Sequence, residues 1–142
     1  HHNTRVAFMT GNLVPGQVYY KAQKLRGMVR QQVLDLLEDV DVLVQPTMAG
    51  PADVINLEAR VGSQGQAKRA LGAGAFRGPY SLAGAPALSI LCGFTSDGDG
   101  ALPLAMQIAG RPFDEATVLR LAHAYEQASP WHTRIPPVAQ EA

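Results

Sequence analysis

The sequence predicts an α/β protein in which a mixed β-sheet is flanked by α-helices. Three observations predict this class. A long helical repeat is followed by a short apolar segment that ends at a proline, two later apolar segments are joined by a glycine-rich turn, and a second helical pattern lies near the end of the sequence. Because helices and strands alternate without an internal repeat or linker, we expect them to form one folded α/β unit.

Composition narrows the classes of partner. The 142 residues are 46% hydrophobic and 17% charged, which is typical of a globular chain. Twelve basic and twelve acidic residues cancel, so no global field attracts nucleic acid or an anionic membrane. No apolar run approaches the roughly 18 residues of a membrane span. The single Cys92, together with the lack of a signal-like start, favours a cytoplasmic location.

The first expected element is a long helix that starts after Pro15 and Gly16. Apolar residues recur at steps of three and four, which places them on one helix face. They are Val18, Ala22, Leu25, Val29, Val33, Leu36 and Val40. Basic residues lie largely off this stripe and are expected to form a solvated face: Lys21, Lys24, Arg26 and Arg30.

Asp41 to Pro46 is the next expected element, a short and mostly apolar strand that proline ends. Such a run suits a strand covered on both faces. From Met48 to Gly74 no period is sustained, so we expect an irregular stretch with one short helix near Gln66 to Leu71.

Two further strands are expected at Ala87 to Leu91 and Leu102 to Ala109. Asp97 to Gly100 lies between them and tolerates the positive φ angles of a reversing turn, so the strands should pair antiparallel.

The last expected element is a helix that Asp114 caps and Pro130 ends. Phe113 stands where it could pack on Val118 as a hydrophobic staple. The apolar face should continue through Leu121, Ala122 and Tyr125.

Side chains suited to nucleophilic catalysis give only weak candidates. Ser63 lies between glycines upstream of Lys68, but the spacing matches neither a G-x-S-x-G elbow nor S-x-x-K, so a surface turn is favoured. Cys92 could pair with His123 as a Cys–His nucleophile. A buried free cysteine and a packed histidine are the favoured interpretations, since no orienting or electropositive group accompanies them.

Metal and nucleotide motifs have no support. Asp97 to Gly100 resembles the start of a calcium loop, yet the third alternating acidic ligand and the distal glutamate are missing. No cysteine–histidine set has zinc spacing, and no phosphate-binding glycine loop occurs. We therefore expect no metal and no cofactor.

A longer pattern runs from Phe76 onward: FRGPYSLAGAPALSILCGF, a turn, LPLAMQIAGRPFDE, and a helix ending in AHAYEQASPW. It resembles the carboxy-terminal part of the amidase signature family, serine hydrolases of carbon–nitrogen bonds. The family pattern there is F-x-x-P-F-N-L-A-G-x-P-A, then G-L-P-x-G-x-Q, then E-x-x-x-x-W. Residues 11–47, which end in D-V-L-V-Q-P-T, also resemble it. The order and spacing of these motifs carry the resemblance.

The resemblance implies that residues 1–142 form the carboxy-terminal part of a single amidase domain. The family's catalytic lysine and two serines lie in an upstream glycine- and serine-rich segment, and nothing here corresponds to them. We therefore assign no catalytic residue and expect the chain alone to be inactive. The resemblance gives this part strands, covering helices and a share of the acyl-side pocket wall. The substrate-binding positions it implies are Thr47, Met48, Tyr80 and Ser81, although Tyr80 could instead belong to the core.

The expected function is hydrolysis of a carboxylic amide through an acyl-serine. One alternative is a noncatalytic binding or scaffold protein derived from an amidase. Another is an amidotransferase subunit that releases ammonia from glutamine, which the F-D-E-x-T-V-x-R-x-A-H-A-x-E-Q run resembles. The acidic residue that recognises the substrate ammonium in those subunits is replaced by Gly74 or a neighbour, which weighs against glutamine. The expected partners are a small-molecule amide and the missing amino-terminal half, with a homodimer as a further alternative.

Overall fold

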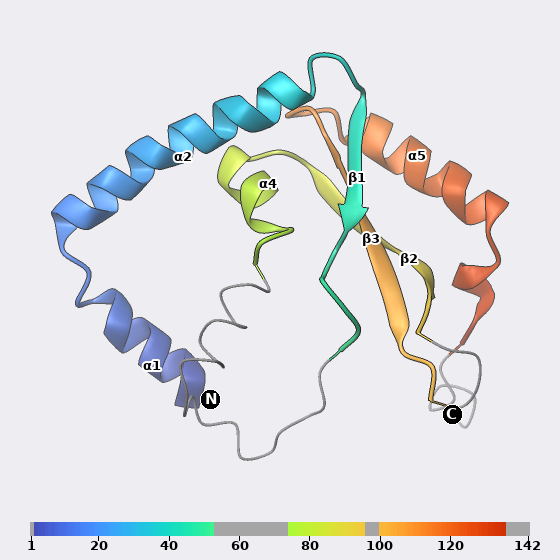
Figure 1. Ribbon diagram of the computed structural model, residues 1–142, viewed down its shortest axis with the longest axis horizontal. Coiled ribbons are helices and arrows are strands. Elements are labelled where there is room, and N and C mark those ends of the chain that lie inside the picture. Colours follow the sequence, from blue (N-terminus) through green and yellow to red (C-terminus); the bar gives the residue numbers. More distant parts are fainter. Residues whose placement is uncertain (1, 53–73, 96–99, 136–142) are drawn as a thin grey trace.

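The computed structural model describes residues 2–52, 74–95 and 100–135, and shows a sheet with helices on both faces (Figure 1). The α/β class with a helix-flanked sheet is confirmed. The elements are α1 (His2–Gly11), α2 (Gly16–Leu36), β1 (Val42–Pro46), α4 (Gly78–Ala83), β2 (Ala87–Phe94), β3 (Pro103–Gly110), α5 (Glu115–Ala128) and a 3₁₀ helix (Trp131–Thr133).

The described part of the sheet has the order β1-β3-β2, and both pairs are antiparallel. Ala109 of β3 lies opposite Leu43 on one side and Ala87 on the other. The predicted β1 strand and the predicted antiparallel pair are therefore confirmed. Residues 97–99 of the expected turn lie outside the described residues, as do the expected helix at 66–71, Ser63 and Lys68.

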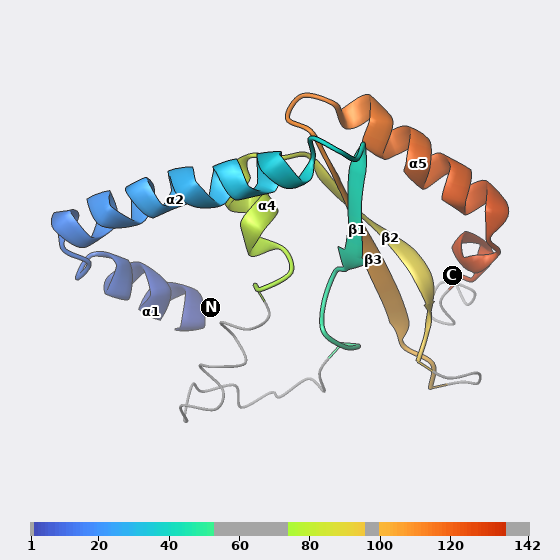
Figure 2. The same ribbon diagram turned by 45° about the horizontal axis from the view of Figure 1, so that its top comes forward.

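The two faces of the sheet bury different side chains, because successive residues of a strand point to opposite sides. On one face, Ala109 and Leu43 pack with α2 and α4; on the other, Ile108 and Ile90 pack with α5. The members that the helices and their ends contribute are Val33, Leu37, Tyr80 and Ala83 on the first face, and Val118 and Ala122 on the second. The central strand β3 thus contributes to both cores. Figures 1 and 2 show the matching placement of the helices, with α2 and α4 on one side of the sheet and α5 on the other.

The predicted long helix is confirmed as α2, but its apolar stripe is buried only near the carboxy end. Val33 and Leu37 are buried, whereas Leu25 is 53% exposed. The helix ends at Leu36, earlier than the expected Val40, and Leu36 itself faces solvent. The physical reason is that α2 meets the sheet only at its last turns. The apolar stripe continues towards the start of the helix, where no strand of the described sheet lies against it.

The predicted solvated face of basic residues on α2 is confirmed, since Lys21, Lys24, Arg26 and Arg30 are all exposed, but two of these residues also bind α4. Arg26 Nε donates to the carbonyl oxygen of Leu82 at 2.8 Å, and Arg30 Nη1 donates to the carbonyl oxygen of Ala83. Both carbonyls belong to the last residues of α4, where helical carbonyls lack intrahelical partners. The two guanidinium groups therefore hold α4 against α2.

The helix α1 was not predicted, because no periodic pattern precedes Pro15 in the sequence. It forms over His2–Gly11, and in both views it lies well away from the sheet (Figures 1 and 2).

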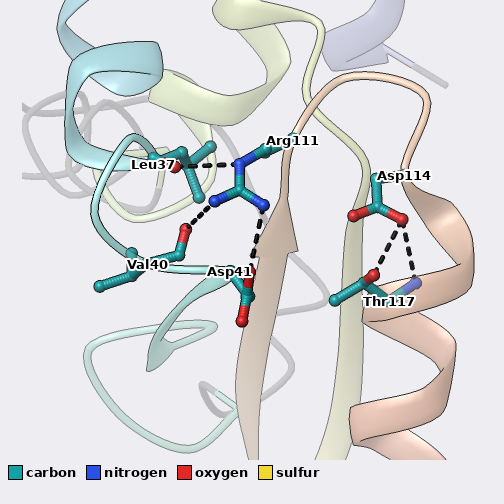
Figure 3. Close-up of polar contacts among 6 residues, drawn as sticks. All are labelled: Leu37, Val40, Asp41, Arg111, Asp114 and Thr117. Atoms are coloured by element: carbon teal, nitrogen blue, oxygen red, sulfur yellow. Dashed lines mark hydrogen bonds and ion pairs between the residues drawn. The ribbon is translucent and has the colours of Figure 1, made fainter.

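The start of α5 confirms one prediction and overturns another. Asp114 caps the helix, since its carboxylate accepts from Thr117 Oγ1 at 2.9 Å and from the Thr117 backbone N–H at 3.4 Å (Figure 3). The Phe113 staple is wrong: Phe113 takes a φ of 65° and its residue is 94% exposed. This left-handed conformation turns the ring away from Val118, which packs instead on Ile108. Leu121 is also exposed, whereas Ala122 is buried and Tyr125 is partly buried against the same cluster, so the predicted apolar face is confirmed for Ala122 and Tyr125 only.

Candidate functional site

A cavity of about 770 Å³ lies beside the end of β1 and the beginning of β3. Most of the side chains that line it are apolar, and none of the described lining residues is charged. The described lining consists of Val44, Gln45, Pro46, Thr47, Met48, Ala49, Gly50, Ala52, Phe76, Cys92, Pro103, Leu104, Ala105 and Met106. A concave, mainly apolar site with a few polar groups is the usual form of a small-molecule site.

The cavity exists because the chain leaves the sheet at the end of β1. Pro46 is the last residue of β1 in register with β3, opposite Met106. Within the described sheet β1 is an edge strand, which tolerates the missing N–H of a proline. The Thr47 N–H still donates to the Ala105 carbonyl at 2.9 Å. Beyond that bond the segment from Met48 diverges, so the first residues of β3 are left open to the cavity.

Polar side chains form a row across the sheet next to this cavity. Gln107 of β3 lies opposite Gln45 on β1 and opposite Ser89 on β2. The hydroxyls of Ser89 and Thr47 are 2.8 Å apart, and Gln45 Nε2 donates to the Phe76 carbonyl. Thr47 is therefore oriented by a partner on another strand.

Gln107 differs from the other polar side chains of this row in its hydrogen bonding. It is 5% exposed, and its Nε2 has no hydrogen-bond partner among the residues that the structure describes. A buried unpaired donor costs about 1–3 kcal/mol. Nothing in the sequence marks Gln107 or Gln45 as site residues, because a single glutamine in an apolar strand carries no signal of what lies opposite it in a sheet.

The four predicted substrate-binding positions lie in two places. Thr47 and Met48 line the cavity. Tyr80 is buried in the cluster with α2, where burial raises the pKa of its phenol, and Ser81 is exposed on α4. The structure thus brings Thr47 and Met48 to the cavity, and gives Tyr80 the packing contacts of a core residue.

The Cys–His alternative has no geometric support among the described contacts. Cys92 lies at an irregularity of β2 between Leu91 and Gly93, and its thiol donates to the Leu104 carbonyl at 3.5 Å. His123 is exposed on α5. Within the described ranges no cluster of three or more metal-ligating side chains occurs. No described helix has the length and hydropathy to cross a membrane.

Comparison with known proteins assigns the chain to a class. A family model described as Amidase matches residues 2–119, and the chain belongs to the amidase family.

The relatives are similar to this chain over most of its length but are much longer than it. A glutamyl-tRNA(Gln) amidotransferase subunit from Synechococcus sp. (strain JA-2-3B'a(2-13)) is 42% identical over 86% of this chain and 22% of its own length. The corresponding subunit from Methanosarcina barkeri is 42% identical over 84% of the chain and 23% of its length. A solved structure, described as a crystal structure of amidase, has a TM-score of 0.67 at 24% identity, over 89% of this chain and 28% of the other.

Proposed function

We propose that this chain is the carboxy-terminal part of a single amidase domain whose catalytic serines and lysine come from outside these 142 residues. The observation that supports this most is the cavity bordered by Thr47 and Met48, the positions that the family resemblance places on the acyl-side wall. Because the chain spans about a quarter or less of the matched relatives, the reaction belongs to a longer protein.

In the proposed reaction the serine Oγ bonds to the amide carbonyl carbon, the C–N bond breaks, and ammonia or an amine leaves with a proton. Water then cleaves the acyl ester and releases a carboxylic acid. This chain supplies the wall against which the acyl group lies. Thr47 is held by Ser89, and the flexible thioether of Met48 adapts to the shape of the acyl group.

The described part of the lining favours an uncharged, largely apolar acyl group. Free glutamine carries an ammonium and a carboxylate, and placing them against these apolar side chains, among which no counter-charge is described, is unfavourable. The alternative, an amidotransferase subunit that takes ammonia from glutamine, is favoured by the names of the relatives. The substrate that the complete protein prefers therefore distinguishes an amidase from an amidotransferase subunit.

The test uses the complete product of the gene that encodes this chain. We expect ammonia release from apolar primary amides such as hexanamide or benzamide to exceed release from glutamine. The reverse preference would establish the amidotransferase alternative. A gene product without a lysine and a serine-rich stretch upstream of these residues would overturn the proposal.

The remaining assignments are also proposals. The noncatalytic scaffold alternative requires a chain that is monodisperse by itself, and the exposed apolar surface described below counts against it. We propose a cytoplasmic location, supported by the single cysteine. A homodimer is a further alternative, which light scattering of the free chain would detect.

A further inference from the structure

The first 29 residues carry an unusual concentration of exposed apolar side chains. We call residues 2–29, which comprise α1 and the first part of α2, the helical arm. Ten of its large hydrophobic residues are more than a third exposed, among them Phe8 at 73%, Leu13 at 80% and Val18 at 56%. Soluble monomers rarely expose large apolar areas, so this many exposed apolar side chains on two successive helices indicates an interaction surface.

The arm is continuous with the hydrophobic core. Val18, Ala22, Leu25 and Val29 share one face of α2, and one turn further along this side of the helix Val33 is buried against Tyr80 and Ala109. The uncovered surface is thus an extension of the core beyond the edge of the sheet.

Two hydrogen bonds hold α2 against α4. Arg26 and Arg30 bind the end of α4 from the side of α2 next to the apolar stripe. The stripe itself is therefore left open to another partner while the helix is held in place.

We propose that the helical arm packs against the part of an amidase domain that this sequence does not contain. The inference rests on the proposed function. The family match begins at residue 2, so the arm lies inside the matched region. The two relatives that are 42% identical are more than four times as long as the segment that matches this chain. The rest of such a protein is large enough to cover the helical arm.

The test compares two matched lysine substitutions on α2 in a split version of the complete gene product. Leu25→Lys places a charge on the apolar stripe, whereas Gln31→Lys places the same charge on the opposite, exposed side of the helix. Each chain is co-purified with the separately expressed remainder of its own gene product, and the dissociation constant is measured. We expect Leu25→Lys to weaken association at least ten-fold and Gln31→Lys to change it less than two-fold.

The free chains provide the folding control. Because Leu25 is exposed in the chain, Leu25→Lys should leave the melting temperature unchanged and reduce self-association in light scattering. A second stripe variant, Val18→Lys, must give the same pattern. Equal binding of the remainder to the stripe and control variants would overturn the proposal. A discrete dimer that Leu25→Lys dissociates, with no effect on the remainder, would also overturn it and identify a second copy as the occupant.

The two proposals fail separately. If the remainder lacks the catalytic lysine and serines but still binds through the stripe, the proposed function fails and the arm interface stands. If the complete protein hydrolyses amides while Leu25→Lys leaves association intact, only the arm proposal fails.

Discussion

Arg111 Nε donates a 3.0 Å hydrogen bond to the carbonyl oxygen of Leu37, 74 residues earlier in the chain (Figure 3). The same guanidinium donates to the Val40 carbonyl at 3.0 Å and pairs with Asp41 at 3.1 Å. It thereby links the end of β3 to the connection between α2 and β1. The register of β1 on β3, and with it the opening of the cavity at the other end of β1, depends on this connection.

We expect Arg111→Ala to lower the free energy of unfolding by about 1–3 kcal/mol, because two backbone carbonyls lose a charged donor. Arg111→Lys should recover only part of this loss, since an ammonium cannot reproduce the planar fork. The matched control is Asp41→Asn. Its ion pair is largely solvent-exposed, so the change should be below about 1 kcal/mol. Urea unfolding measures all three, and equal losses for Arg111→Ala and Asp41→Asn would contradict the assignment.

Gln107→Leu should raise the free energy of unfolding by about 1 kcal/mol, because it removes a buried donor that has no partner within the described part of the chain. Gln45→Leu, directly opposite, should lower stability because Gln45 Nε2 is bonded to the Phe76 carbonyl. Two facing glutamines thus respond with opposite signs. Destabilisation by Gln107→Leu in urea unfolding would show that its amide has a partner after all.

Gly110→Ala should destabilise the protein by about 1–3 kcal/mol through overpacking. A Cβ at this position would lie 2.6 Å from Val118 Cγ2, at the contact between β3 and α5. Val118→Ala should relieve the clash, so thermal unfolding of the double mutant should show less than additive loss. The control is Gly27→Ala in the middle of α2, where a Cβ meets nothing within 4 Å. There alanine should stabilise by about 0.5–1 kcal/mol.

Alkaline pH should destabilise the protein through Tyr80. Burial raises the pKa of this phenol above its ordinary value of 10.0, so the folded state holds the proton more tightly than the unfolded state. The contribution is complete below pH 10 and is lost as the pH rises through the folded pKa. Tyr80→Phe should reduce the fall in stability above pH 10 in urea titrations at stepped pH. Tyr19→Phe, on an exposed ring, should not.

Thr47→Val should lower kcat/KM of the complete protein for an amide about ten-fold, because it removes the hydroxyl at the cavity wall and its bond to Ser89. Ser81→Ala tests the other polar position that the resemblance implies: because Ser81 is exposed on α4 and is not among the described lining residues, we expect it to change kcat/KM less than two-fold. Equal effects of the two substitutions would argue against the cavity as the substrate site.

Local signals in the sequence were sufficient for several elements. The three- and four-residue steps predicted α2, the apolar run before Pro46 predicted β1, and Asp114 predicted the start of α5. Each of these depends on neighbours within a few residues, such as the Thr117 N–H that donates to Asp114. The resemblance to amidases was likewise carried by ordered motifs and is confirmed by the family match.

By itself the sequence determined the class, the family and the positions of the strands and of the two long helices. Only the tertiary structure decided which apolar residues are covered: Val33 is buried and Leu25 is exposed on the same stripe. It also decided that Arg30 binds α4 and that Tyr80 faces the core while Thr47 faces the cavity. The physical reason is that periodicity fixes which side of an element a residue occupies, whereas burial depends on distant segments that come to lie against that side.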